Sequence, residues 1–183
     1  SLVIALARHF LDDVTAEMAA SSLKSLGRDR PELISEILPA LVDLFEHDAA
    51  GRYASDVFEY LSVHQSAAAA KSLPSILPDL ISHLINDTGY RYASNALSTI
   101  ADRDRSAAEA IASGLASKLD QADARERILR VLTDIGKSEP AAVNSVVEEV
   151  LPYIDEGTDI VRSRSLQVLK HAVRSGYKIE DST

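Results

Sequence analysis

One pattern of six apolar residues recurs four times along this chain and constrains its fold more than any other feature. In each copy the apolar side chains lie at offsets 0, 3, 4, 7, 8 and 11 from the first. On a helix with about 3.6 residues per turn, these offsets form one continuous stripe. The pattern therefore predicts four amphipathic helices, whose first stripe residues are Ile34, Leu73, Ala108 and Val143.

A second, shorter set of helices is predicted between these four. Its pattern is a small or apolar residue followed by further apolar or small residues four and seven positions later. Successive copies lie 35 to 39 residues apart, a spacing typical of arrays in which helical hairpins follow one another. The copies begin at Ala19, Ala54, Ala93, Ile128 and, more weakly, Ser165.

The tetrapeptide RYAS occurs twice, at residues 52–55 and 91–94. Its alanine falls on the first position of the second pattern in both copies. We therefore interpret RYAS as a mark of the repeat register rather than as a binding motif, with the tyrosine covering the start of a helix.

Helix spacing locates two insertions relative to an underlying period of 35 residues. Four extra residues lie within HQSAAAAKS, residues 64–72, and two more lie around DEGTD, residues 155–159. Both are expected in connections between helices, where stacked hairpins tolerate insertions. The second is expected to be a loop that supplies the N-cap of the following helix.

Prolines mark several of the predicted helices. Pro31, Pro74 and Pro140 are expected in first turns, where the missing N–H has no intrahelical partner. Pro39 and Pro78 share one repeat position, five residues beyond the first stripe residue. A kink or a restart of the helix is expected at both.

These patterns predict an all-α protein, an α-α superhelix or solenoid of about four helical hairpins with a half repeat at each end. One solenoid domain is expected over residues 1–175. The expected boundaries are half repeats at 1–12 and 157–175, repeats at 13–48, 49–87, 88–121 and 122–156, and a tail at 176–183.

Four stretches resemble the HEAT-type family of α-helical repeats. DIVRSRSLQVLKHAV at 159–173 and DARERILRVLTDIG at 123–136 resemble the first helix of that repeat. LPALVDLFEHD at 38–48 and LPDLISHLIND at 77–87 resemble its second helix. The resemblance extends over nearly the whole chain and implies a right-handed α-solenoid that binds partners along its inner curve.

The chain departs from the HEAT pattern in its middle repeats. Arg52 and Arg91 lie one repeat position later than Arg125 and Arg162. The family's Asp–Arg ladder is therefore not implied for the middle of the array. Tetratricopeptide repeats, with a period of about 34 residues, are the main alternative. Their Trp, Gly and Tyr signature is absent from the first helices here.

Composition and motifs argue against catalysis. The absence of cysteine excludes thiolate metal sites and cysteine nucleophiles. The chain has no phosphate-binding loop, no HExxH helix and no GxSxG turn. Its five histidines are scattered among different repeats, and none has a metal-ligand spacing. We therefore expect a protein without enzyme activity, cofactor or metal.

Nucleic acid and membranes are not expected partners. A net charge of −9 disfavours binding to a phosphate backbone. Apolar runs are short, and the opening LVIALA is interrupted by Arg8 and His9, so no membrane span is predicted. The lack of cysteine fits a reducing compartment, and a cytoplasmic location is expected.

The polar faces of the second helices of the repeats form the candidate binding surface. They are acidic and rich in small residues, as expected for the inner curve of a solenoid. A groove of this kind admits a partner helix or an extended peptide. The candidate partner-binding residues are Glu32, Glu36, Asp43, Asp79, His83, Glu109, Ser113, Ser145 and Glu149.

These features favour a non-catalytic scaffold or adaptor that presents its groove to a protein or peptide segment, with a basic segment as the favoured partner. One alternative is a regulatory repeat segment of a larger protein, which could itself be an enzyme, because the chain begins inside an apolar stretch. A nucleic-acid-binding HEAT-like protein is a third hypothesis, which the acidity disfavours. Adaptation to high salt is a separate explanation of the acidity.

Overall fold

Helices are the regular elements of this protein throughout the part that the structure describes. The computed structural model describes residues 1–12, 14–86 and 88–178, and every regular element in these ranges is a helix. The predicted all-α class is therefore confirmed. The chain divides into two compact units, Ser1–Asp104 and Arg105–Thr183.

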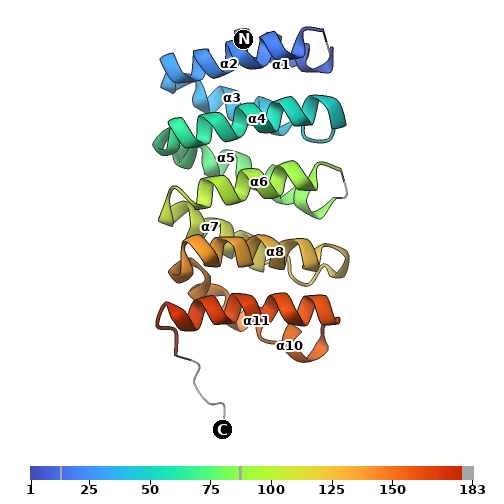
Figure 1. Ribbon diagram of the computed structural model, residues 1–183, viewed down its shortest axis with the longest axis vertical. Coiled ribbons are helices and arrows are strands. Elements are labelled where there is room, and N and C mark those ends of the chain that lie inside the picture. Colours follow the sequence, from blue (N-terminus) through green and yellow to red (C-terminus); the bar gives the residue numbers. More distant parts are fainter. Residues whose placement is uncertain (13, 87, 179–183) are drawn as a thin grey trace. The chain divides into compact units, whose positions relative to one another are not determined.

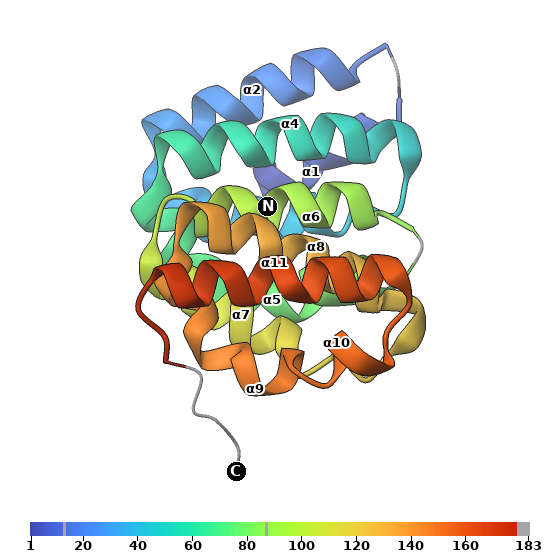
Figure 2. The same ribbon diagram turned by 60° about the horizontal axis from the view of Figure 1, so that its bottom comes forward.

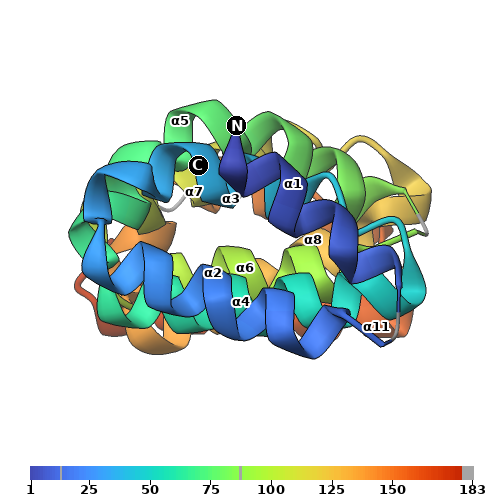
Figure 3. The ribbon, with the colours of Figure 1, turned by 90° about the horizontal axis from the view of Figure 1, so that it is seen from above.

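The first unit consists of two layers of helices, which Figure 3 shows on opposite sides. In one layer, which holds the first helices of the repeats, each helix packs against the next (Figure 1). This layer contains α2 (Ala16–Asp29), α4 (Asp48–His64) and α6 (Tyr90–Ala101). The other layer holds the second helices α1 (Leu2–Arg8), α3 (Ile34–Val42) and α5 (Ser66–Ile85). Short 3-10 turns follow α1, at His9–Leu11 (η1), and precede α3, at Pro31–Leu33 (η2).

The second unit repeats this two-layer plan. Its first helices α8 and α11 pack against each other, and α7 packs against the 3-10 segment η3 in the other layer. Figure 2 shows α9 and α10 below α11, which contacts both of them. The elements are α7 (Arg105–Ala116), α8 (Ala122–Ser138), η3 (Pro140–Val146), α9 (Val147–Val150), α10 (Tyr153–Glu156) and α11 (Asp159–Arg174).

The repeated apolar patterns form the core. Of the 24 residues in the four stripes, 21 are buried, and Leu77, Leu151 and Ile154 are half-buried. Of the 15 positions in the second pattern, 14 are buried, and Leu26 is half-buried. Full burial of each such Leu or Ile side chain contributes roughly 1.5 to 3 kcal/mol to folding. The apolar periodicity therefore identified the residues that hold the two layers together.

The insertion in the second repeat is helical, contrary to the expectation of a connection. α4 ends at His64 and α5 begins at Ser66, so that Gln65 alone separates them. The four alanines at 67–70 extend α5, which reaches 20 residues. Alanine has the highest helix propensity of the common residues, and this propensity outweighs the general tolerance of connections for insertions.

The prolines follow the predictions only in part. Pro31 and Pro140 begin the 3-10 segments η2 and η3, as expected for first turns. Pro74 lies inside α5 rather than in its first turn, because the alanine run moves the start of that helix to Ser66. Pro78 also lies inside α5, which does not restart there.

The last second helix is broken, although its stripe predicted one amphipathic helix. The segment after Pro140 forms η3, then the short helices α9 and α10. Its sequence PAAVNSVVEEVLP is rich in valine and also holds Asn and Ser, all weaker helix formers than alanine or leucine. Pro152 stands immediately before α10 and cannot continue a helical hydrogen-bond ladder. Weak propensity and this proline divide the helix, while its apolar side chains still point to the core.

The stretch 155–159 supplies the predicted N-cap, but its loop is limited to residues 157–158, because Asp155 and Glu156 belong to α10 and Asp159 begins α11. Gly157 lies between α10 and α11, and Thr158 is the N-cap of α11. The Thr158 hydroxyl accepts a hydrogen bond from the backbone N–H of Val161 at 3.4 Å. This N-cap satisfies one of the free N–H groups at the start of α11.

The two RYAS copies make equivalent contacts in the first unit. Ala54 and Ala93 are fully buried. The ring of Tyr53 lies 6.3 Å from that of Phe10, and the ring of Tyr92 lies 5.8 Å from that of Phe45. Both phenylalanines follow the end of a second helix, so each tyrosine packs the start of a first helix against the preceding hairpin. The interpretation of RYAS as a structural mark agrees with these contacts.

Some boundary predictions fall on residues that the structure does not describe. Residue 13, the expected start of the first full repeat, and residue 87, the expected end of the second, lie outside the described ranges. Of the predicted tail at 176–183, residues 179–183 also lie outside them. Residues 176–178 follow α11 without forming a regular element.

Candidate binding surface on the second helices

The nine predicted binding residues are distributed over both units, and eight of them are exposed. The first unit holds Glu32, Glu36, Asp43, Asp79 and His83, and the second holds Glu109, Ser113, Ser145 and Glu149. His83 is half-buried, with its ring 6.1 Å from that of Phe45. Its imidazole therefore takes part in the packing of aromatic rings below the surface.

An open groove of about 390 Å³ lies between the segment η2–α3 and helix α5 in the first unit. Ile34 is fully buried at its base, and Ser72 is 6% exposed. Exposed side chains from both helical segments form its rim. The lining residues are Pro31, Glu32, Ile34, Ser35, Ala68, Lys71, Ser72 and Ser75. Of the nine predicted residues, Glu32 lines the groove.

One wall of the groove comes from the insertion in the second repeat. Ala68, Lys71 and Ser72 all belong to the stretch 64–72, which extends α5. The sequence prediction missed these three residues because it assigned the stretch to a connection. The run of four alanines is the signal that would have placed them on a helix.

The rim of the groove carries charges of both signs. Glu32 forms an ion pair with Arg30, and the hydrogen bond from the Arg30 guanidinium lowers the pKa of the Glu32 carboxyl. On the opposite wall Lys71 is exposed, and no carboxylate of residues 1–12, 14–86 or 88–178 lies within ion-pair distance of it. The groove therefore offers a carboxylate already paired and an ammonium group still available to a partner.

Three further carboxylates lie on the same exposed faces beyond the groove. Glu36 and Asp43 follow Glu32 at helical spacing, and Asp79 follows Lys71 by eight residues on α5. All three are exposed, and among the described residues no cation forms an ion pair with them. This edge of the first unit is therefore an acidic strip with unpaired carboxylates.

Serine hydroxyls in the groove bond to their own helices. Ser75 Oγ donates to the carbonyl oxygen of Ser72 at 2.7 Å, and Ser72 Oγ donates to that of Ala68 at 2.9 Å. A hydroxyl that donates in this way keeps its oxygen lone pairs for another donor. Backbone N–H groups of an extended peptide are donors of the required kind.

The predicted residues of the second unit form a less acidic surface. Glu109 is paired with Arg105 at 3.0 Å, one turn away on α7. Ser113 lies on the same helix, and Ser145 and Glu149 lie on η3 and α9. Tyr177 donates its hydroxyl to Glu148 at 3.0 Å, so a side chain that follows α11 reaches this layer.

Among the described residues, no group of three or more His, Asp or Glu side chains is placed to hold a metal ion. Within the same ranges, the helices also lack a segment long and apolar enough to cross a membrane.

Comparisons with known proteins show the fold and no more. No protein-family model and no curated protein sequence match the chain. Three crystal structures titled as engineered proteins, from the Northeast Structural Genomics Consortium, are similar to it. Their TM-scores are 0.51, 0.50 and 0.53, with 18%, 18% and 20% sequence identity. The matches cover 96%, 92% and 95% of this chain, and 81%, 47% and 80% of the engineered chains. The same helical packing thus occurs in proteins with few residues in common.

Proposed function

We propose that this chain is a non-catalytic scaffold of HEAT-like repeats, an α-solenoid that binds a protein segment along the exposed faces of its second helices. The two-layer packing within each unit and the shared register of their first helices support the solenoid arrangement. A cytoplasmic location fits the absence of cysteine.

The observation that carries the proposal is the groove beside the acidic strip in the first unit. The apolar side chains of Pro31 and Ala68, a free ammonium group at Lys71 and serine oxygens provide contacts for a peptide. The carboxylates of Glu36, Asp43 and Asp79 lie beyond the groove. A peptide that extends past the groove would place its next side chains beside them. Because these three have no ion pair among the described residues, a basic partner would find carboxylates that are already free.

The expected partner is an extended or helical peptide segment with lysine or arginine side chains. Exposed charges at a rim contribute mainly to the association rate and to specificity, and their effect falls with ionic strength. The affinity itself would come from the apolar side chains of Pro31 and Ala68 and from backbone contacts within the groove.

Binding to synthetic peptides tests the proposal. Fluorescently labelled peptides of graded net charge, from acidic to basic, would be titrated with the chain and followed by fluorescence anisotropy. We expect saturable binding of basic peptides, weakened by added salt. The variant E36K/D43K/D79K is expected to weaken that binding roughly tenfold or more, since it replaces attraction with repulsion.

A matched variant controls for net charge. E17K/E59K/D102K changes three exposed acidic residues in or directly after the first helices and, like the acidic-strip variant E36K/D43K/D79K, moves the net charge from −9 to −3. It is expected to retain most of the binding. Equal losses in the two variants would assign the effect to overall charge, and the absence of saturable binding to any basic peptide would contradict the proposal.

A further inference from the structure

Lys71 and the carboxylates of the acidic strip lie in a fixed order along the second helices of the first unit. Lys71 occupies the same repeat position as Glu32, since each lies two residues before the first stripe residue of its helix. Counted from this shared position, the three carboxylates follow after 4, 8 and 11 residues, in the order Glu36, Asp79 and Asp43.

Both helices run away from the groove in the same direction. The lining of the groove comes from residues 31–35, at the start of α3, and from residues 68–75, in the first half of α5. Because α3 and α5 pack against each other, the groove lies at the N-terminal end of their contact. The three carboxylates are all C-terminal to it and lie about 6, 12 and 16 Å beyond Lys71 along the helices, at about 1.5 Å per residue.

Lys71 is the cation of the groove lining, and the serines beside it turn their hydroxyl hydrogens away from a ligand. Ser72 and Ser75 donate to carbonyl oxygens of α5, and Ser35 donates within its own segment. A carboxylate that enters the groove therefore has the exposed ammonium group of Lys71 as its charged partner. The Glu32 carboxylate across the groove is already compensated by its ion pair, which weakens its repulsion of an entering carboxylate.

An extended peptide can match this order of charges. Its residues rise about 3.3 Å each, and every second side chain points to the same side. When one side chain contacts Lys71, the second and fourth residues beyond it lie about 6 and 12 Å away, beside Glu36 and Asp79. A lysine at the sixth residue has a side chain long enough to reach back to Asp43.

We infer, resting on the peptide binding proposed above, that the groove selects segments with ordered charges. One acidic side chain of the segment binds Lys71, and basic side chains at alternate positions beyond it bind the acidic strip. Overall attraction acts in the opposite direction, because a chain with a net charge of −9 repels an added carboxylate. The acidic side chain therefore strengthens binding through Lys71 although it makes the peptide less basic.

Competition between peptides in fluorescence anisotropy tests this selection. Unlabelled heptapeptides, acetylated and amidated so that only side chains carry charge, would displace one labelled basic peptide from the chain. EAKAKAK and its reverse KAKAKAE place a glutamate at one end for either direction of the bound peptide. QAKAKAK removes its charge, and KEKAKAA has the same composition but points the glutamate away from the lysines. We expect one of the first two peptides to bind roughly threefold or more tightly than both of the others.

Reversing the charge of Lys71 provides the second test. The peptide KAKAKAK carries a lysine in place of the terminal glutamate. The unmodified chain is expected to prefer the glutamate-ended peptide to KAKAKAK, and K71E is expected to reverse this order. Because the reversal requires K71E to gain affinity for one peptide, it cannot result from misfolding.

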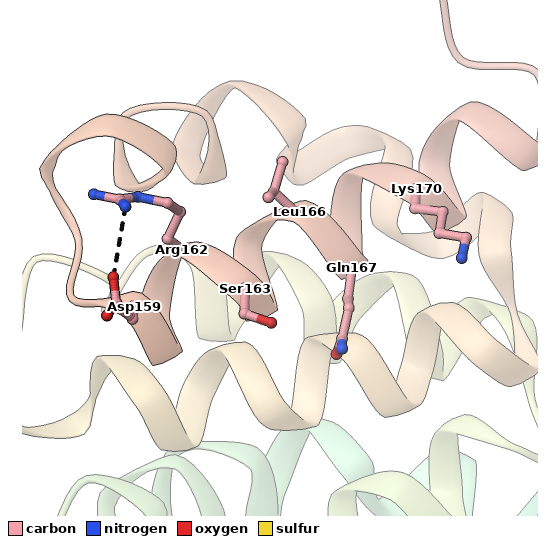
Figure 4. Close-up of a pocket in the computed structure, with 6 residues that line it drawn as sticks. All are labelled: Asp159, Arg162, Ser163, Leu166, Gln167 and Lys170. Atoms are coloured by element: carbon pink, nitrogen blue, oxygen red, sulfur yellow. Dashed lines mark ion pairs between the residues drawn. The ribbon is translucent and has the colours of Figure 1, made fainter.

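Lys170 offers a matched control in the second unit. It is exposed, lines a hollow of about 380 Å³ along α11 (Figure 4), and has no ion pair within the part of the chain that the structure describes. K170E and K71E both move the net charge from −9 to −11. K170E is expected to keep the preference for the glutamate-ended peptide.

The other outcomes overturn the inference in distinguishable ways. If QAKAKAK binds as tightly as both glutamate-ended peptides, or if K71E keeps their preference, the ordered selection is excluded, while the binding of basic peptides stands. Equal losses of preference in K71E and K170E would assign the effect to net charge and exclude it as well. Absence of saturable binding by the labelled basic peptide would overturn the ordered selection together with the proposed function.

Discussion

Arg125 donates its Nε–H to the backbone carbonyl oxygen of Leu119 at 2.7 Å. The bond connects α8 with the end of the preceding hairpin, and the guanidinium also lies 4.3 Å from the ring centroid of Tyr153. Arg162, at the same repeat position in α11, donates to the carbonyl oxygen of Ile154 at 2.8 Å. A repeated arginine therefore anchors each first helix of the second unit.

Loss of this anchor is expected to destabilise the second unit. Hydrogen bonds from charged donors contribute about 1.5 to 3 kcal/mol, so R125A should lower the free energy of unfolding by about that amount. Urea denaturation followed by circular dichroism measures the change. R130A, at an exposed arginine on the same helix, is the control and should change stability by less than about 0.5 kcal/mol. Equal effects of the two substitutions would contradict the role of Arg125.

Gly89 provides a test of the close approach before α6. Its φ is +80°, and a Cβ there would lie 2.5 Å from the carbonyl oxygen of Phe45. G89A should therefore lower the free energy of unfolding by the left-handed penalty of about 1 to 2 kcal/mol. The backbone shift needed to relieve the clash should lower it further. Gly176 also has a positive φ, of +97°, but its Cβ would meet open space. Thermal unfolding should show G89A losing clearly more stability than G176A, and an equal loss would exclude the clash.

Pro78 in the middle of α5 is expected to reduce stability. It lacks the N–H that would bond to the carbonyl oxygen of Pro74, and an interior proline costs a helix about 3 kcal/mol. Greater freedom of the unfolded chain offsets part of the gain in P78A, leaving about 2 kcal/mol. P31A, in the first turn of η2, should be nearly neutral. Differential scanning calorimetry measures both, and a lower Tm for P78A would show that the packing of α5 depends on this proline.

His171 is expected to make stability depend on pH. Burial lowers its pKa from 6.5, and the nearby cations Arg174, Lys137 and Lys170 lower it further. Protonation is then easier in the unfolded chain, so the free energy of unfolding falls as the pH drops below 6.5 and levels off below the lowered folded pKa. H171Q should make the free energy of unfolding depend less on pH in this range. Urea titrations at several pH values measure that dependence.

Much of the fold was predictable because the spacing of apolar residues along a helix determines which side chains are buried. The stripe that begins at Ile34 and the triplet that begins at Ala54 depend on helical geometry alone, and all their residues are buried. Helix continuity was harder to predict, because it depends on a balance of small terms. The alanines at 67–70 extended a helix, whereas the valines after Pro140 and the proline at 152 divided one.

The candidate site was predictable in its exposure but less so in its geometry. Glu36 and Asp79 are exposed, as the amphipathic pattern requires. The groove arises where η2 meets the extended start of α5, and no local pattern reveals which two segments will meet. The half-burial of His83 was not evident from the sequence, because its packing against Phe45 depends on a ring from the segment that follows α3.

The lengthened start of α5 has a consequence for recognition. Repeats of nearly equal length present the same surface again and again, so a ligand has little reason to prefer one location over another. The residues added at 64–72 make one hairpin unlike its neighbours and place Ala68, Lys71 and Ser72 beside η2. A four-residue change in length can thus give a repetitive protein one surface that a ligand can distinguish from the others. The apolar spacing that holds the hairpins together stays the same.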